Sequence, residues 1–460
     1  MTKAFRLTYL LALVFALSVF GCGQSTPAPQ EEAAPPEAAP QETAAPKTAA
    51  QEEAASLPTS ATAAATEAKL AEETPALEPG TLPPDHWLVG TSDVPDMVPA
   101  VIAPEAPRTL LREHGPAYLE QVGLLRILHL KGSHYDMGVQ HGTLMAEEIR
   151  NAAALIKMVG SMESGDFGVT IREAWDRTSP FIPDKYKEEI RGMAEATGLS
   201  IEEVQDFTIF PELFHCSGFA FWGKATADGE LLHGRVLDYM RDIGLDKYAL
   251  VIVHEPESAN AVVNIAYSGM IGSVTGMNNQ HVAIGEMGGG GEGNWDGMPM
   301  SILVRECLEM GDTLEDVRRM MEETPRTCQY YYCVSDSKVG GGPGSAFGVA
   351  AEPDSIIFIE PNQAHPMLAR PVEDAVLMSA GDRYQCLVDR VEKMHGQITP
   401  QIALDIMARG VSMSSNMHDC LFKPATLEIW VANSTVESPA CNLPYTHLDM
   451  ATLMSEKPAS

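Results

Sequence analysis

Residues Cys216 to Asp238 read CSGFAFWGKATADGELLHGRVLD, and this stretch is the most informative part of the chain about its fold and its candidate site. Two strand-like runs flank Asp228-Gly229, a dipeptide typical of β-hairpin turns. Cys216 opens the first predicted strand, and Arg235 and Asp238 close the second. Because a hairpin brings its two ends together, we expect the thiol, the guanidinium and the carboxylate to converge. A free thiol, with a pKa of about 8.5, needs a base or a positive charge to become a good nucleophile.

The phrase WGKATADGELLHGR-x-L-D resembles the N-terminal-nucleophile (Ntn) hydrolases. The nearest resemblance is to the autoproteolytic family typified by acyl-coenzyme A:6-aminopenicillanic acid acyltransferase, with choloylglycine hydrolases more distant. The G-x-x-Y-x-x-G-x-x-H-G phrase from Gly132 to Gly142 also resembles this family. The resemblance runs from about Gly132 to about Asn433. It implies an α+β fold, a four-layer αββα sandwich, and self-cleavage between His215 and Cys216.

The resemblance also implies roles for the hairpin residues. Cys216 becomes the nucleophile once its α-amine is free, and that amine, with an ordinary pKa of about 7.7–8.0, acts as its base. Arg235 and Asp238 match the family's R-x-x-D: Arg235 would hold the thiolate charge and Asp238 would orient the amine. The alternative is a buried structural cysteine beside a strand-end ion pair. Val236 stands where the family often has Asn.

Two residues are candidate donors to the oxyanion of the tetrahedral intermediate. Gly276-Met277-Asn278 resembles the family's G-x-N turn, so Asn278 would donate its amide hydrogen. Its alternatives are a purely conformational role in the turn or replacement by Asn279. Tyr331 aligns with a second family Asn, and its hydroxyl can donate or simply pack in the core.

Other motifs carry less chemistry. His418, in an N-x-H phrase with Asn416, is expected to form structural hydrogen bonds, because an Ntn enzyme needs no histidine base. His134 and His141 lack a third ligand at metal spacing, and the Gly288–Gly291 run lacks the Lys-Ser/Thr ending of a phosphate-binding loop. We therefore expect no metal and no cofactor, and a glycine-rich loop that lines the substrate mouth near Trp295.

The N-terminus predicts export. Lys3 and Arg6 precede the apolar run Leu7–Phe20, which is too short for a comfortable membrane span, and Gly21-Cys22 follows. This resembles a lipoprotein signal with Cys22 as the lipid anchor; an ordinary secretory signal is the alternative. Residues 23–85 are rich in Ala, Pro and Glu, and such a composition predicts a disordered tether.

The charge of the chain limits its partners. The formal net charge is −32, and eleven of the 63 acids and four of the 31 bases precede residue 86. The remaining chain therefore carries a net charge of about −25, which argues against nucleic acid as a partner. We expect a small-molecule amide substrate, and a membrane reached only through the lipid anchor. The eight cysteines include two sequence-near pairs, Cys328/Cys333 and Cys420/Cys441, which are either disulfides or buried free thiols.

The expected organisation has four parts: a signal peptide (1–22), the tether (23–85), the segment before the cut (86–215) and the catalytic segment (216–460). The last two would stay together as alpha and beta fragments of one sandwich. Residues 87–123 show no regular pattern, and Ser200 to Glu203 resembles a helix capping box. Strands are expected at 124–130, 248–255, 261–268, 281–285, 330–335, 345–351, 355–360 and 426–433, and helices near 144–156, 180–197, 299–308, 313–323 and 384–394.

These observations predict an exported, self-activating cysteine amidohydrolase or acyltransferase that cleaves a linear or cyclic amide through an acyl group on Cys216. Outside the cell, where coenzyme A is absent, water is the expected acceptor. Alternatives are a bile-acid or N-acyl-amine amidase on the same fold, a catalytically silent binding lipoprotein, and a Cys-His thiol hydrolase using His215, His233 or His418.

Overall fold

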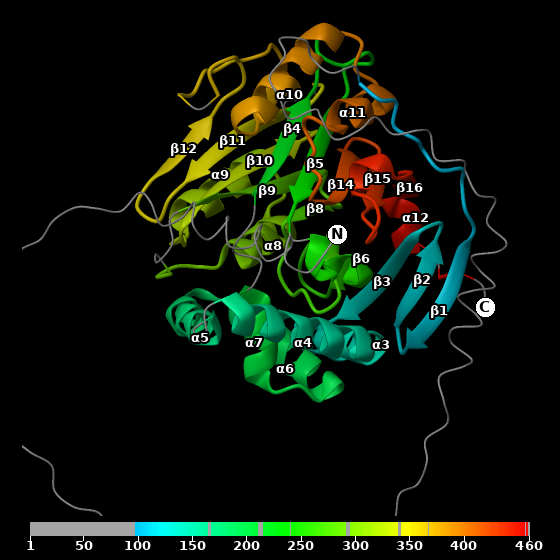
Figure 1. Ribbon diagram of the computed structural model, residues 1–460, viewed down its shortest axis with the longest axis vertical. Helices are drawn as coiled ribbons and strands as arrows, with labels where there is room; N and C mark the ends of the chain where they lie inside the picture. Colours follow the sequence, from blue (N-terminus) through cyan, green and yellow to red (C-terminus); the bar gives the residue numbers. More distant parts are fainter. Residues whose placement is uncertain are drawn as a thin grey trace, which may run out of the picture. The chain divides into compact units, whose positions relative to one another are not determined.

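The structure is a computed structural model that describes residues 97–163, 167–209, 215–239, 241–290, 295–338, 342–366, 368–455 and 457–458. The predicted signal peptide, the tether and Cys22 lie outside these residues. The described residues form a mixed α/β structure with two large sheets (Figure 1).

The larger sheet has ten strands, and every neighbouring pair is antiparallel except the parallel pair β3–β6. In spatial order its strands are β1 (Arg108–His114), β2 (Ala117–Val122), β3 (Leu125–Gly132), β6 (Ala249–Pro256), β7 (Val262–Tyr267), β8 (Thr275–Asn278), β9 (Val282–Gly290), β10 (Gln329–Asp336), β11 (Ser345–Ala351) and β12 (Ile356–Ile359).

The smaller sheet has six antiparallel strands, and the hairpin that begins at His215 lies within it. In spatial order the strands are β13 (Ala375–Met378), β4 (His215–Phe221), β5 (Leu232–Asp238), β14 (Asn416–Lys423), β15 (Glu428–Asn433) and β16 (Thr446–Asp449).

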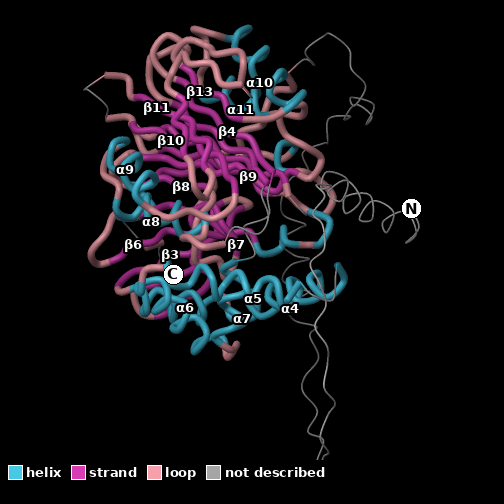
Figure 2. The backbone as a smooth tube through the Cα atoms, turned by 90° about the vertical axis from the view of Figure 1, so that its left-hand side faces the viewer, coloured by secondary structure: helices cyan, strands magenta, loops and turns pink. Residues whose placement is uncertain are grey.

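The sheets face each other, with β4 packed on β9 and β10, and β13 on β10 and β11. Helix α3 (His134–Leu144) covers β3, while α8 (Met300–Met310) and α9 (Leu314–Glu323) cover β8–β10. Helices α10 (Gly381–Met394) and α11 (Pro400–Met407) cover the smaller sheet. The layers therefore follow the predicted order helix, sheet, sheet, helix (Figure 2). The other helices are α4 (Ala146–Glu163), α5 (Phe167–Thr178), α6 (Asp184–Thr197), α7 (Ile201–Ile209) and α12 (Met450–Ser455).

Apolar side chains fill the space between the sheets. Ile127 and Val253 of the larger sheet pack against Cys420, Phe422 and Val431 of the smaller one, and none of these five has exposed surface. Burying a side chain of this size contributes about 1.5–3 kcal/mol. The two sheets are therefore held face to face by a continuous core.

Two local predictions are confirmed. Strands β4 and β5 pair from His215 opposite Asp238 to Phe221 opposite Leu232, so the Cys216 hairpin is present. Ser200 and Glu203 form the predicted capping box at the start of α7, each side chain accepting a hydrogen bond from the backbone amide of the other.

Two predictions need correction. Residues 108–122, expected to be irregular, form the hairpin β1–β2 around Gly115, whose φ of 58° suits glycine. The glycine run, expected to be a loop, instead extends β9 to Gly290, because its backbone pairs with β10. Backbone hydrogen bonds to a neighbouring strand thus outweigh the weak strand propensity of glycine.

The described cysteines, Cys216, Cys307, Cys328, Cys333, Cys386, Cys420 and Cys441, are all free thiols, and five of them are buried. The disulfide alternative for Cys328/Cys333 and Cys420/Cys441 is therefore not found in this structure. Among the described helices, none combines the length and apolar character that a membrane span requires.

Candidate active site

Cys216 lies near the start of β4 with its thiol almost completely buried. The predicted cut bond, His215–Cys216, lies within the strand, and the cross-strand partners of these two residues are Asp238 and Leu237. Burial raises the pKa of the Cys216 thiol to about 12, the charge of Arg235 acts against this rise, and the carboxylates of Glu286 and Asp238 add to it. The thiol is therefore protonated at neutral pH and needs a base before it can attack.

Arg235 lies on β5 between the sheets, directly over β9. Its Nη2 lies 3.5 Å from Oε2 of Glu286, and neither side chain has exposed surface. A Cβ at Gly285 would come within 2.9 Å of the Cδ of Arg235, so the missing side chain of this glycine makes room for the guanidinium. A buried arginine opposite a buried carboxylate keeps a fixed positive charge beside the thiol.

Asp238 closes β5 and points toward α10, since residues three apart on a strand face opposite sides of the sheet. Its Oδ2 accepts a hydrogen bond from Nη2 of Arg383, and its Oδ1 accepts one from the backbone amide of Met413 at 2.9 Å. Burial raises the pKa of Asp238, while the positive charge of Arg383 and the Met413 hydrogen bond lower it. The carboxylate and the Arg235 guanidinium thus flank the Cys216 end of the hairpin from two faces.

Arg383 connects Asp238 to the strand that carries the cysteine. Its Nη2 donates to Oγ of Ser217 at 2.6 Å, and Ser217 in turn shares a 2.7 Å hydrogen bond with Oγ of Ser379. The residue next to Cys216 is therefore tied to Asp238 through a single guanidinium.

The structure does not favour the predicted oxyanion role of Asn278. Its Nδ2 donates both hydrogens, to the carbonyl oxygens of Leu308 and Gly311 at 2.8 Å each. Its Oδ1 accepts from the amides of Gln280 and Val282 at 3.0 Å. The side chain is fully engaged in closing the β8–β9 turn onto the end of α8, which leaves no amide hydrogen for a substrate.

Tyr331 lies half-buried on β10, opposite Met287 of β9. Burial and the charge of Glu352 raise the pKa of its hydroxyl, which therefore stays protonated and can donate. Its proposed contact with an oxyanion at Cys216 stays a prediction.

A second tyrosine, Tyr267 at the end of β7, lies within electrostatic reach of the thiol. Burial raises the pKa of Tyr267 strongly, Arg235 lowers it, and the charge of Cys216 raises it further. The hydroxyl contacts Nδ1 of His418 at 3.3 Å, and Nε2 of that ring contacts Oγ1 of Thr275 at 3.1 Å. Burial and the nearby Arg235 hold the pKa of His418 well below its ordinary value, so the ring is neutral and serves as a hydrogen-bonding bridge.

No family model matches this chain. Among curated proteins, it is 23% identical to protein dcd1B of Dictyostelium discoideum over 383 residues, which cover 72% of this chain and 75% of that protein. It is 23% identical to dcd1A of the same organism, over 69% of this chain and 80% of that protein. It is 26% identical to acid ceramidase of Rattus norvegicus over 191 residues, which cover 35% of this chain and 47% of that enzyme.

Solved structures give weaker likenesses. The Caenorhabditis elegans ortholog of N-acylethanolamine-hydrolyzing acid amidase is 12% identical, with a TM-score of 0.36, and the match covers 45% of this chain and 93% of that one. Penicillin V acylase from Agrobacterium tumefaciens is 11% identical, with a TM-score of 0.36, over 53% of this chain and 90% of that one. TM-scores this low establish no shared activity.

Three residues of this site were missed by the sequence analysis: Glu286, Arg383 and Tyr267. Glu286 had a usable signal, since it is the single charge in the strand Val282–Gly290. Arg383 had none, because it follows Asp238 by 145 residues and looks like any charge in the first turn of a helix. Tyr267 looks like an ordinary strand aromatic, and only the packing of the two sheets brings it near the thiol.

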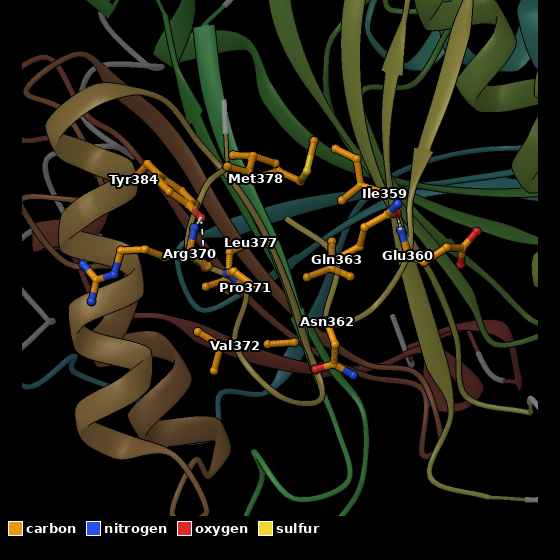
Figure 3. Close-up of a pocket in the computed structure, with 13 residues that line it drawn as sticks. Ile359, Glu360, Asn362, Gln363, Arg370, Pro371, Val372, Leu377, Met378 and Tyr384 are labelled. Carbon is orange, nitrogen blue, oxygen red and sulfur yellow. Dashed lines mark hydrogen bonds between the residues drawn. The ribbon is translucent and has the colours of Figure 1, made fainter. Parts of the chain in front are cut away.

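A pocket lies beside β13, the edge strand of the smaller sheet that pairs with β4 (Figure 3). It contains about 310 Å³ of empty space, part of it open to solvent. Met378, which lines it, pairs with Gly218 on β4, two residues after Cys216. Across the pocket, the Tyr384 hydroxyl lies 3.0 Å from the backbone of Arg370. Within the described part of the chain, no three His, Cys, Asp or Glu side chains come together as a metal site.

Proposed function

We propose that this protein is an Ntn-type cysteine amidohydrolase that cuts its own chain before Cys216 and then cleaves an amide substrate through an acyl-thioester. The observation that carries the proposal is the surroundings of the thiol: Cys216 is buried at the start of β4, beside the Arg235–Glu286 pair and one strand from Asp238. A structural cysteine needs no such set of charges.

The first step is the self-cleavage. Sγ of Cys216 attacks the carbonyl carbon of His215, the thiol proton passes to the departing amide nitrogen, and a thioester replaces the peptide bond. Water then hydrolyses the thioester. This releases the carboxylate of His215 and leaves Cys216 with a free thiol and a free α-amine.

The second reaction uses that amine as a base. With an ordinary pKa of about 7.7–8.0, it can accept the thiol proton near neutral pH. Sγ attacks the substrate carbonyl, the C–N bond breaks, and the amine product leaves with the proton. Water attacks the resulting thioester, releases the acid and restores the thiol. Arg235 holds the thiolate charge, and Asp238, fixed by Arg383, orients the α-amine.

The tetrahedral intermediate needs a hydrogen-bond donor, and Tyr267 is a better candidate than Asn278. Its side chain is half-buried and its hydroxyl is protonated; with the hydrogen of the neutral His418 ring on Nδ1, the hydroxyl accepts from His418 and keeps its own hydrogen for the intermediate. A preorganised donor of this kind contributes about 2.7–4 kcal/mol to a barrier. Tyr331 remains the candidate for a second donor.

The relatives support the reaction class. Acid ceramidase is named for the cleavage of ceramide, whose acyl chain is held by an amide. The matching region spans under half of that enzyme, so we extend to this chain only the class of bond, with the acyl and amine groups open. A bile-acid or N-acyl-amine substrate falls within the same class.

Export and lipid anchoring through Cys22 belong to the proposal as well, on the strength of the Lys3 to Cys22 pattern. In a bacterial host that lipidates lipoproteins, a labelled fatty acid should enter the wild-type protein and not the Cys22→Ala variant. Equal labelling of the two proteins, or labelling of neither, would contradict lipid anchoring through Cys22 and favour an ordinary secretory signal.

The decisive experiment is intact-mass and N-terminal analysis of the purified protein, of Cys216→Ala, and of Cys307→Ala as a matched variant that loses a buried thiol on α8. We expect two fragments from the wild type and from Cys307→Ala, one of them beginning at Cys216, and one uncut chain from Cys216→Ala. An uncut wild-type chain would contradict the Ntn mechanism and favour a binding lipoprotein or a Cys-His enzyme.

A further inference from the structure

The 408–415 loop, which we define as residues Ala408–Ser415 between α11 and β14, contacts both members of the Asp238–Arg383 ion pair. The backbone amide of Met413 donates to Oδ1 of Asp238 at 2.9 Å. The carbonyl oxygen of Val411 accepts from Nε of Arg383 at 2.7 Å. Two backbone groups two residues apart therefore fix the carboxylate and the guanidinium relative to each other.

The same loop also reaches the residue after Asp238. The amide of Tyr239 donates to the carbonyl oxygen of Ser415 at 3.1 Å. Asp238 is thus restrained through its carboxylate by Met413 and through the following peptide by Ser415. Every one of these contacts uses loop backbone, so the sequence of the loop alone does not reveal them.

The loop is held in shape from its far side by Arg390 of α10. This buried guanidinium donates to the carbonyl oxygens of Ile406, Ala408 and Arg409 at 2.8, 3.0 and 2.6 Å. Gly410 takes a φ of 108°, and a Cβ there would lie 3.2 Å from Nη2 of Arg390 and 3.0 Å from Sγ of Cys386. The loop therefore has one defined conformation set by a glycine and an arginine that are remote from the thiol.

We propose that the 408–415 loop is the positioning element of the candidate active site, and that the Met413 amide keeps Asp238 charged and aimed at the α-amine of Cys216. This inference rests on the proposed function. A buried carboxylate loses the hydration that favours its charge, and a hydrogen bond from a backbone amide restores part of it. Without the amide, Asp238 binds a proton more readily, and a neutral acid holds an amine poorly.

Asp238 is surrounded by charges from several elements, and all of them contribute to its protonation. The charged and titratable groups that act on it or feel its charge are Arg383 of α10, Arg235 of β5, Arg409 of the loop, Cys216 of β4, Asp419 of β14 and Cys441. A proline at position 413 changes none of these groups; it removes one N–H donor and fixes φ at about −65°.

The test compares Met413→Pro with Met413→Ala. Both variants lose the methionine side chain, and only the proline variant loses the backbone N–H. Loss of a hydrogen bond to a charged group shifts the pKa of that group by about one to two units. Relative to Met413→Ala, we expect the limb of the rate of amide hydrolysis that follows Asp238 ionisation to move up by at least about one pH unit, so that kcat falls about tenfold on that limb while KM stays nearly unchanged.

A merely structural loop predicts a different result: lower thermal stability with the same midpoint of the pH profile in both variants. That outcome would overturn the proposal. If Met413→Pro does not fold, Gly410→Ala replaces it, because the added Cβ displaces the loop without touching any N–H of the site. A folded Gly410→Ala with the wild-type pH midpoint would likewise overturn the proposal.

Failure of the proposed function is separable from failure of this inference. If the wild-type chain neither cuts itself nor hydrolyses amides, the function fails, and the loop is then tested by NMR titration of the Asp238 carboxyl itself. Because the Met413 amide donates directly to Oδ1 of Asp238, a loop that keeps this carboxylate charged must give a higher titration midpoint in Met413→Pro than in Met413→Ala. Equal midpoints would reject the loop's role.

Discussion

Nη1 of Arg305 lies 2.9 Å from Oε1 of Glu189, and neither side chain has exposed surface. This pair joins α8, which follows Cys216 in the sequence, to α6, which precedes it. Nε of Arg305 also lies 2.9 Å from Oε1 of Glu309, and Glu309 in turn contacts His134 of α3 at 3.0 Å. The two segments on either side of the predicted cut are therefore connected by a buried network of charges.

Replacing Arg305 by Met should lower the free energy of unfolding by about 3–5 kcal/mol, because it leaves the buried carboxylate of Glu189 without its counter-charge and removes one partner of Glu309, which keeps Lys185. The matched control is Arg319→Met, which removes an exposed arginine paired with Asp316 and should cost under about 1 kcal/mol. Urea denaturation of both variants measures the difference. Equal losses would mean that the Arg305 network contributes little to stability.

Asn278→Ala should act on stability rather than on chemistry. It removes four hydrogen bonds at the end of α8 and the β8–β9 turn, each worth about 0.5–1.5 kcal/mol. We expect a lower unfolding midpoint with kcat per folded molecule within about twofold of wild type, since an oxyanion donor would give 100-fold or more. A large fall in kcat in a stable Asn278→Ala protein would restore the oxyanion role first predicted from the sequence.

Tyr267→Phe should show the opposite pattern. Loss of the hydroxyl removes the proposed oxyanion donor but leaves the ring in place, so kcat should fall by about 100-fold with only a small change in stability. Tyr384→Phe is the control, since that hydroxyl contacts the Arg370 backbone in the neighbouring pocket. If both variants keep full activity, the donor must be sought elsewhere, with Tyr331 as the next candidate.

Acid should destabilise the protein through its buried neutral histidines. Burial, assisted by Arg305, lowers the pKa of His141 to about 3, against an ordinary value of about 6.5. Between these values the unfolded chain binds a proton that the folded chain does not, so this contribution is complete above pH 6.5 and is lost as the pH falls. Its slope is about 1.4 kcal/mol per pH unit.

The measurement is the urea midpoint of wild type and His141→Gln at pH 7, 6 and 5. The free energy of unfolding of His141→Gln should fall less steeply with decreasing pH than that of the wild type, by about 1.4 kcal/mol per pH unit, which is the contribution of one titrating group. Comparing two proteins cancels other titrating groups, including Asp419, whose buried carboxyl has a pKa raised to about 7 and acts in the opposite direction. Parallel pH curves for the two proteins would show that His141 is protonated alike in the folded and unfolded states.

Structural elements that depend on residues close in the sequence could be predicted, and those that depend on tertiary packing could not. Ser200 to Glu203 predicted the capping box, because it depends on residues three positions apart. The hairpin was also predicted, although its strands end at Phe221 and Leu232 and are joined by ten residues rather than by a tight turn at Asp228-Gly229. The β1–β2 hairpin has no alternating pattern, since four of the seven residues of β1 are consecutively exposed. β1 is a strand because it pairs with β2, and the local sequence pattern does not predict this pairing.

The candidate site divides in the same way. Cys216, Arg235 and Asp238 lie on one hairpin, so the chain order itself predicted their proximity. Arg383 and Tyr267 reach this site only because a helix and the second sheet pack against the hairpin. The role of Asn278 could not be assigned from the sequence, because a turn asparagine that accepts from the backbone has the same sequence signature as one that donates to a substrate.

The parallel pairing of β3 with β6 has one more consequence. β3 precedes Cys216 and β6 follows it, so a single sheet contains strands from both sides of the proposed cut. A post-Cys216 segment made alone would display the edge of β6 as an unpaired template for other chains. Two genes encoding the halves separately would therefore be a poor substitute for one, and continuity of the polypeptide during folding is itself a safeguard against aggregation.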